Sequence, residues 1–539
     1  MRMHRDYPAR FEIRFPPAQT RNTDMFKIRW PLLRRYKSSL ATRPPLNVPY
    51  KTGQPMHETR THLIPQPGHL TPGISALEYY NRRLALAKEM PAKSAAILVG
   101  NQVQHSSGSV FYHFEQDTDL YYLTGWLSPD SVAVLEKVSD NGTDEDVVLH
   151  MLVPPKNAAT DLWEGDKNGL EGAYDFFNAD EVGDVNRVEP YLREILKRNE
   201  TIFFDTKIRG PTGNGGVSGK FALFFSLPLN SRHSTIRSVL ESLNKSVRPL
   251  KPILAQHRLV KSEAEIRVMH KAGQISSRAI NTAIAKVGSA APFSSEKVLA
   301  KYLEYAFVKG GCDREAYIPV VASGENALTL HYTRNDDLLY RDETVFIDAG
   351  GKLGGYCADI SRAWPNAPHG FSGPQKDIYN VVLSANKKCI SECFAHNHSL
   401  QSLHELAVTT LLQGLRDLPG MSHVTRSDVT RDLFPHYIGH HLGLDLHDVP
   451  SVSRTAQLVP GNVVTVEPGL YIPQDDKWPR HFQGIGVRVE DDIAVGKTAS
   501  ESRNLTSLCV KEVEDIEALI RLGKVTTPHA YDEMVDLDI

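Results

Sequence analysis

Four carboxylates and one imidazole in the second half of the sequence have the types and spacing of a metal site. Each carboxylate lies in or at the end of an apolar, strand-like run, and the five residues are Asp348, Asp359, His440, Glu467 and Glu490. Burying such anions is costly without a cation or hydrogen-bond donors. Two divalent cations would neutralise the set, with Asp359 and Glu490 as natural bridges between them.

The ligand types also limit the metal and indicate a reaction. Oxygen-dominated ligation with one imidazole favours Mn²⁺, or Co²⁺, Fe²⁺ or Zn²⁺, over a thiolate-bound structural zinc. Two such ions roughly 3.5 to 4 Å apart can share a hydroxide, a nucleophile at neutral pH, while they polarise a carbonyl. We therefore expect two divalent metal ions, with Mn²⁺ as the first choice, and hydrolysis of an amide bond.

The pattern around the first two carboxylates predicts two strands joined by a tight connection. Residues 345–348 are an apolar run that ends at Asp348, and residues 350–355 are glycine-rich and predict a hairpin. Residues 356–363 predict the return strand, which carries Asp359. Helical spacing predicts helices at 262–287, 374–394 and 402–415. Upstream, alternating strand and helix patterns from residue 79 to 204 predict an α/β domain.

Length and composition are those of a multidomain globular chain. Its 539 residues suffice for two or three domains, and 61 basic against 64 acidic residues leave no basic field for nucleic acid. Five cysteines without C-x-x-C spacing suggest neither a disulfide framework nor a thiolate zinc site, so Cys389 and Cys393 are expected to pack in the core. The sequence has no uncharged apolar run of about 18 residues, which argues against an integral membrane protein.

The first residues differ in composition from the rest. Residues 25–57 contain Lys and Arg but no Asp or Glu, which is typical of a mitochondrial presequence, although a disordered basic tail has the same charge. If Met25 is the effective start, cleavage after Arg35 would expose Tyr36, and its removal would leave Lys37 first. Residues 41–75 are proline-rich and predict an extended linker, and residues 207–247 predict mostly loop.

Several strings carry a resemblance to a known family. HHLGLDLHD at 440–448, TVEPGLYI at 465–472 and GVRVED at 486–491 resemble the aminopeptidase P branch of the pita-bread metallopeptidases. Upstream, FEQDTDLYYLTG at 114–125 is similar to the creatinase-like N-terminal domain of that branch. The resemblance spans residues 79–520. It implies an α/β (α+β) fold in which a smaller creatinase-like α/β domain precedes a pita-bread catalytic domain.

The resemblance also implies domain limits and residue roles. We expect a targeting segment and linker at 1–78, an aminopeptidase P N-terminal domain at 79–250, a catalytic domain at 251–522 and a tail at 523–539. Asp348 would hold one metal, Asp359 and Glu490 would bridge, and His440 and Glu467 would complete the other. Glu467 would also move a proton. The substrate-side positions that orient the peptide and stabilise the tetrahedral intermediate match His331, His436, His447 and Arg488, and Tyr471 matches a position near the metals.

The sequence thus predicts a metalloaminopeptidase that releases one residue from the N-terminus of a peptide or protein. The basic leader favours the mitochondrial intermediate cleaving type, which trims proteins after presequence removal, in the matrix or at the inner membrane. A general Xaa-Pro aminopeptidase is the main alternative, and a non-catalytic scaffold is disfavoured because all five ligands are present. The resemblance makes a homodimer a further expectation. The remaining histidines, His396, His398, His404 and His441, are expected to be solvated or structural.

Overall fold

The structure, a computed structural model, describes residues 52–205 and 231–525. The expected presequence with its Arg35–Tyr36 cleavage site, and nearly all of the expected tail, lie outside these ranges. No helix within the described ranges has both the length and the apolar character needed to cross a bilayer. For description, the chain is divided at residue 250, the boundary expected from the sequence, into the N-terminal domain and the expected catalytic domain.

The N-terminal domain is built on a mixed sheet with the strand order β10-β9-β3-β6-β7-β8. Strand β3 pairs parallel with β9 and antiparallel with β6. The elements of this domain are β1 His69–Thr71, β2 Ile74–Ser75, α1 Ala76–Glu89, β3 Ser94–Val99, β4 His105–Ser107, β5 Val110–Phe111, α2 Thr118–Thr124, β6 Val132–Lys137, β7 Val147–Val153, α3 Ala158–Glu164, α4 Gly169–Asp175, β8 Glu181–Asp184, α5 Val188–Arg198, β9 Thr201–Phe203, α6 Ser231–Ser242 and β10 Ser246–Arg248.

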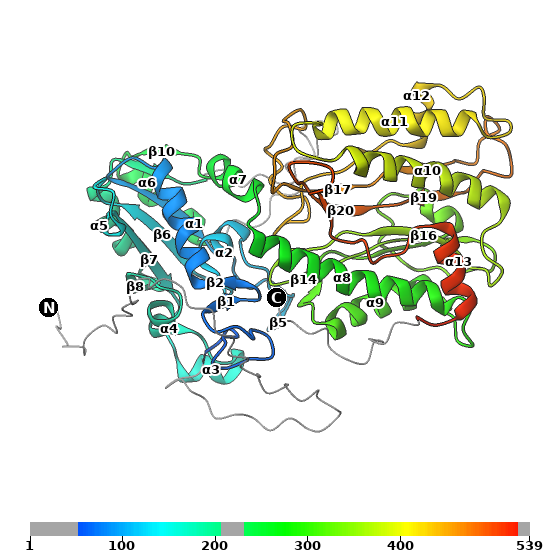
Figure 1. The fold of residues 1–539 in the computed structure, drawn as a ribbon. Coiled ribbons are helices and arrows are strands. Elements are labelled where there is room, and N and C mark those ends of the chain that lie inside the picture. Colours follow the sequence, from blue (N-terminus) through cyan, green and yellow to red (C-terminus); the bar gives the residue numbers. More distant parts are fainter. Residues whose placement is uncertain (1–51, 206–230, 526–539) are drawn as a thin grey trace, which may run out of the picture. The chain divides into compact units, whose positions relative to one another are not determined.

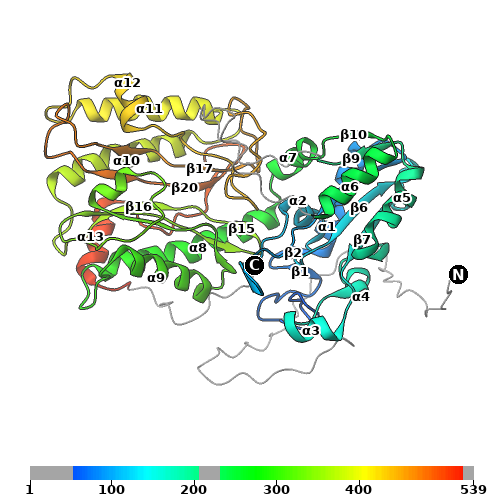
Figure 2. The same ribbon diagram turned by 180° about the vertical axis from the view of Figure 1, so that it is seen from behind.

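Helices cover both faces of this sheet, because successive side chains of a strand point to opposite faces. Ala96 and Leu98 of β3 pack with residues of α1 and α2, whereas Ile97 and Val99 pack with residues of α5 and α6. Figures 1 and 2 show these two helical layers from opposite sides. The predicted α/β domain is therefore a three-layer unit.

Two sequence-based interpretations are wrong in this domain. Residues 52–75 are not an extended linker, because Met56, Leu70 and Ile74 are buried in the core and the Gln54 side chain donates to the carbonyl of Gly125. Prolines exclude regular helix but do not prevent packing. The segment 207–247, predicted to be mostly loop, contains α6 and the start of β10. Its polar composition made α6 difficult to recognise, although the helix has an apolar face that includes Ile236.

The catalytic domain alternates long helices with short antiparallel strands. Its elements are α7 Lys251–Leu259, α8 Glu263–Lys286, α9 Glu296–Gly310, β11 Arg314–Glu315, β12 Val320–Ser323, β13 Thr344–Asp348, β14 Gly351–Leu353, β15 Tyr356–Cys357, β16 Ser361–Pro365, α10 Gly373–Glu392, α11 Leu400–Arg416, α12 Arg426–Asp428, β17 Val463–Val466, β18 Gly469–Tyr471, β19 Gly486–Arg488, β20 Asp491–Ala494, β21 Arg503–Asn504 and α13 Val513–Leu522. The three long helices predicted from spacing correspond to α8, α10 and α11.

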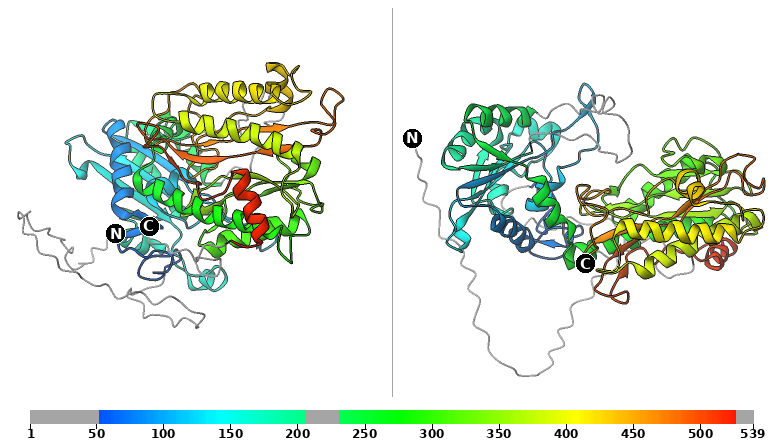
Figure 3. Two further views of the ribbon diagram at one scale, coloured as in Figure 1. Left: turned by 45° about the vertical axis from the view of Figure 1, so that its right-hand side comes forward. Right: turned by 90° about the horizontal axis from the view of Figure 1, so that it is seen from above.

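The strands of this domain lie between two pairs of helices. Figure 1 shows β16, β17, β19 and β20 between the pair α8 and α9 and the pair α10 and α11, and the left view of Figure 3 shows the same layering. Helix α8 begins at a capping box in which Ser262 and Glu265 satisfy each other's backbone N–H groups, and it buries Ile266, Met269 and Ala272 on one face. Cys389 and Cys393 are buried in the core, as expected.

The segment that carries Asp359 differs from the single return strand predicted. Strand β14 returns through a turn at Gly354 and Gly355, both with positive φ of 55° and 86°, into the two-residue strand β15. The chain then leaves this sheet and joins a second three-stranded sheet as β16, which pairs with β13. Asp359 lies in the break between β15 and β16.

Candidate metal centre

Pairing of β13 with β16 brings the first two carboxylates together. Asp348 is opposite Ser361 in the register, and the backbone N–H of Ala349 donates to the carbonyl of Ile360 at 3.0 Å. Asp359 is therefore fixed two residues before the position opposite Asp348. The hydroxyl of Tyr317 lies 2.5 Å from an oxygen of each of these two aspartates. The two carboxylates accordingly face one point.

The later ligands reach the same point from other strands. Glu467 directly follows β17, and its N–H donates to the carbonyl of Ile438 at 2.8 Å. Glu490 lies between β19 and β20, and its N–H donates to the carbonyl of Ser361 at 3.1 Å. The backbone of His440 is tied to that of Thr465 at 2.9 Å. Backbone pairing thus sets the positions of all these residues.

The five predicted ligands form one cluster. Asp359, His440 and Glu490 offer ligand atoms that all lie within 4.8 Å of one another. His440 Nε2 is 3.4 Å from Asp359 and 3.8 Å from Glu467, and Asp348 is joined to Asp359 through Tyr317. Such a group of ligand atoms has the size of a metal site.

The electrostatics of the cluster call for added positive charge. Burial raises the pKa of Glu467 to about 7 and that of Asp348 to about 6, although His440 and Arg488 oppose these shifts. Burial, reinforced by the charges of Asp359 and Glu467, raises the pKa of Glu490 well above its usual range. The protein's own cations therefore do not compensate these carboxylates. The donor set fits a pair of divalent cations.

His440 is oriented as a metal-ligating imidazole is. Its Nδ1 lies 3.0 Å from the carbonyl of His441, so Nδ1 carries a proton and donates. This leaves Nε2 directed at Asp359 and Glu467, which are acceptors. A cation between these groups resolves the conflict, and a backbone acceptor behind a metal ligand is the usual way to fix its tautomer. Although burial opposes charging, the two carboxylates raise the pKa of His440.

The histidines expected on the substrate side lie around the cluster in different environments. Burial and Arg488 lower the pKa of His436 to about 3, and burial and His440 lower that of His447 to about 4, so both rings are neutral at physiological pH. The His447 ring lies 4.3 Å from the His440 ring. His331 is exposed, and it lies close enough to both His436 and His447 to influence their pKa values.

Arg488 lies behind the carboxylates rather than on an open face. Its side chain is 5% exposed and pairs with Asp348, and it donates to Ser361 Oγ at 2.9 Å and to the Tyr471 hydroxyl at 2.8 Å. The Tyr471 hydroxyl in turn lies 2.9 Å from His436 Nε2. These contacts favour a supporting role for Arg488 over the substrate contact expected from the sequence.

Sequence reasoning missed two residues of the cluster. Tyr317 bridges the two aspartates, and Ser361 donates to Glu490 at 2.6 Å while accepting from Arg488. A tyrosine just ahead of an apolar run and a serine inside one were the available signals. Neither pattern is specific, because both residue types are common near buried strands.

A buried ion-pair network outside the metal cluster holds the segment that carries His447. Arg258 on α7 donates to Asp448 at 2.5 Å, to Asp445 at 2.7 Å and to Asp119 on α2 at 2.7 Å. Lys261 donates to the second oxygen of Asp448 at 2.9 Å. The residues on both sides of His447 are thereby fixed.

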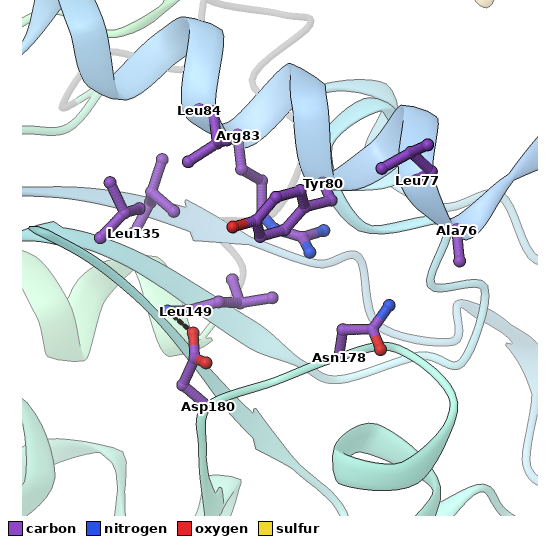
Figure 4. A pocket seen from close by; sticks show the side chains of 10 residues that line it. Ala76, Leu77, Tyr80, Arg83, Leu84, Leu135, Leu149, Asn178 and Asp180 are labelled. Atoms are coloured by element: carbon purple, nitrogen blue, oxygen red, sulfur yellow. Dashed lines mark hydrogen bonds between the residues drawn. The ribbon is translucent and has the colours of Figure 1, made fainter. Parts of the chain in front are cut away.

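A separate cavity in the N-terminal domain has a different lining. It has a volume of about 310 Å³, and its walls include Tyr80 and Arg83 of α1, Leu135, Leu149 and Asp180 (Figure 4). The described residues that line it include one carboxylate but no imidazole or thiolate. It is not a second metal centre of the kind described above.

Comparison with known proteins finds relatives over the whole chain. Metallopeptidase family M24 matches residues 267–497, and the aminopeptidase P N-terminal domain matches residues 79–203. Intermediate cleaving peptidase 55 of Saccharomyces cerevisiae is 45% identical, over 99% of this chain and 100% of its own length. Its crystal structure, which lacks the N-terminal 58 residues, has a TM-score of 0.75 and covers 85% of this chain and 100% of that chain, at 45% identity.

Two further relatives come from other organisms, and one of them carries a different name. Xaa-Pro aminopeptidase 3 of Homo sapiens is 33% identical over 90% of this chain and 94% of its own length. Intermediate cleaving peptidase 55, mitochondrial, of Arabidopsis thaliana is 32% identical over 87% of each. The backbone similarity and the two matched regions, in this order, confirm the fold class that the sequence predicted.

Proposed function

The chain belongs to the aminopeptidase P branch of metallopeptidase family M24 and is a metalloaminopeptidase; from this premise we propose that it trims one residue from mitochondrial proteins after presequence removal. The active centre would hold two divalent cations, with Mn²⁺ as the expected metal. The observation that carries the proposal is the cluster of uncompensated buried carboxylates with one oriented imidazole.

We assign the ligand roles from the family resemblance. Asp348 would hold one cation, His440 and Glu467 would hold the other, and Asp359 and Glu490 would serve both. When bound, the cations supply a nucleophilic water at neutral pH and polarise the scissile carbonyl. The strands beside these side chains are buried, and their backbone pairing holds the ligand residues in position.

The protein's own groups would handle the proton and the peptide. Glu467 would accept a proton from the attacking water and return it to the leaving amine. His447, whose ring packs beside that of His440, and the exposed His331 would orient the peptide and donate to the oxygen of the tetrahedral intermediate. Arg488 restrains Asp348, and Tyr471 links Arg488 to His436.

Two observations support a mitochondrial trimming role. The Saccharomyces relative, named an intermediate cleaving peptidase, is similar over the full length, and the Arabidopsis relative is named mitochondrial. The basic, acid-free segment 25–57 has presequence composition. We place the enzyme in the matrix or at the inner membrane, as a homodimer. A general Xaa-Pro aminopeptidase activity is the second candidate, because the human relative carries that name.

The test is a comparison of mitochondrial N-termini in cells with the wild-type enzyme and with Glu467→Gln. We expect a set of proteins to be one residue longer with the variant, without a requirement for proline in second place. The enzyme itself should begin at Lys37 in the wild type and at Tyr36 in the variant. His396→Ala is the matched control and should behave as wild type. Changes confined to substrates with proline second would establish the alternative instead.

A further inference from the structure

A fully buried carboxylate outside the metal cluster gathers the loop that carries His331. Glu296 is the first residue of α9, and its side chain is 0% exposed. One oxygen accepts from the N–H of Ser323 at 2.8 Å and from the Asn326 amide at 3.0 Å. The other accepts from the Tyr332 hydroxyl at 2.9 Å and from the N–H of Asp337 at 2.8 Å.

All four donors belong to one segment, residues 323–337. This segment leaves β12, makes a 3-10 turn at Gly324–Leu328 and passes His331, and the chain re-enters the sheet later, at β13. The backbone N–H of Glu296 also donates to the carbonyl of Asp337 at 3.0 Å. Two of the side-chain contacts lie before His331 and two lie after it, so one carboxylate fixes the loop on both sides of the imidazole.

The contacts are not those of a helix cap. The N-terminus of α9 is capped by Ser295, whose hydroxyl accepts from the N–H of Val298 at 3.3 Å. The carboxylate oxygens of Glu296 instead accept hydrogen bonds from the neighbouring loop. Its place at a helix N-terminus stabilises the negative charge, and four donors offset the cost of burying it. The ring of His331 is exposed, so its position depends on the backbone that Glu296 holds.

We propose that Glu296 is a positioning residue for His331: it holds the loop so that this imidazole meets the peptide beside the metal centre. The inference rests on the substrate-side role of His331 in the proposed function. It assigns Glu296 no contact with metal or substrate. Its loss should therefore act only through His331.

The test is a double-mutant cycle of Glu296→Gln with His331→Ala. Glutamine keeps the shape but offers one acceptor oxygen, so the N–H of Ser323 or of Asp337 faces an amide N–H instead. We expect Glu296→Gln to lower kcat/KM by roughly tenfold or more, because small displacements of a positioned group are costly. Metal content should stay unchanged. In the His331→Ala background the same change should alter kcat/KM by less than about twofold.

Two further variants keep the test decisive. Tyr332→Phe removes only one of the four donors and should show a smaller loss with the same dependence on His331, even if Glu296→Gln folds poorly. Asp146→Asn is the matched control, since Asp146 accepts from the N–H groups of Gly142 and Thr143 in the N-terminal domain. It should leave kcat/KM unchanged in both backgrounds.

The outcomes separate this inference from the proposed function. Additive losses in the double mutant, or loss of metal with Glu296→Gln, would overturn the positioning role alone. Wild-type activity of His331→Ala would overturn the role of His331 in the proposed function, and the positioning role with it.

Discussion

Two glutamates that are buried to the same degree, one in each domain, have pKa values shifted in opposite directions. Glu136 in the N-terminal domain and Glu490 in the catalytic domain are each 1% exposed. Burial disfavours the charge of Glu136, but Arg198, His150 and Asn199 donate to it at 2.6 to 2.9 Å and lower its pKa to about 2. The pKa of Glu490 instead rises well above its usual range.

The difference lies in the neighbours rather than in the burial. Glu136 faces donors that belong to its own domain, so its negative charge is satisfied by the fold. Glu490 faces Asp359, Glu467 and Asp348, which raise its pKa, and the opposing charge of Arg488 does not offset them. A buried carboxylate whose neighbours are other carboxylates indicates a functional site, because its charge needs a cation that the chain itself does not provide. This contrast distinguishes a structural carboxylate from a ligand.

The largest expected effect comes from removing the bridging ligand. Glu490→Ala should lose metal and lower kcat by about 10³-fold or more, since a bound metal contributes several kcal/mol to the transition state. Elemental analysis and turnover of the purified variant measure both. Retention of two metals with normal turnover would remove the distinction between the two glutamates.

Replacing a histidine beside the cluster should lower activity less than Glu490→Ala does, and without loss of metal. His447→Ala should keep its metal but lose kcat/KM by roughly 10²-fold, the size expected for one preorganised donor to the transition state. Metal content and kinetics are measured together, with His404→Ala as the control of unchanged activity. A parallel loss of metal would make His447 a ligand or a structural support.

Removing the metal by chelation should show that the ligand carboxylates and the structural carboxylate Glu136 change the stability of the protein with pH in opposite directions. A carboxyl whose pKa is raised on folding stabilises the protein at low pH and loses that contribution as pH rises through the folded value. With pKa values near 6 and 7 for Asp348 and Glu467, the chelated enzyme should melt lower at about pH 7.5 than at about pH 5. Added Mn²⁺ should raise Tm more at the higher pH. A Tm shift on metal binding that is the same at both pH values would contradict the electrostatic account.

For Glu136 the dependence of stability on pH has the opposite sign. Its lowered pKa contributes stability above pH 4.5 that is lost as pH falls toward about 2.

The smallest effect on activity is expected in the N-terminal domain. Glu136→Ala should cost about 1–3 kcal/mol of stability, because buried donors lose their acceptor, while kcat/KM and metal content stay within about twofold of wild type. Chemical denaturation and kinetics of the same preparation measure this. Loss of metal in this variant would show that the two carboxylates are not independent.

Much of the centre could be predicted because strand ends are readable in the sequence. Asp348, Asp359, Glu467 and Glu490 each interrupt or end an apolar run, and a carboxylate there indicates a site. Tyr317 and Ser361 could not be predicted, since their partners come from strands distant in the chain. Arg488 was found from its string, but its pairing with Asp348 depends on how β19 lies against β13.

The sequence by itself determined the ligand types, their order and the long amphipathic helices, because apolar periodicity and residue chemistry are local properties. Only the tertiary structure decided which partners each charge meets. It packed the proline-rich residues 52–75 into the core, interrupted the strand at Asp359, and gave Glu136 and Glu490 opposite pKa shifts. The physical reason is that the free energy of a buried charge depends on neighbours brought from far along the chain. Residue type and burial alone do not set its value.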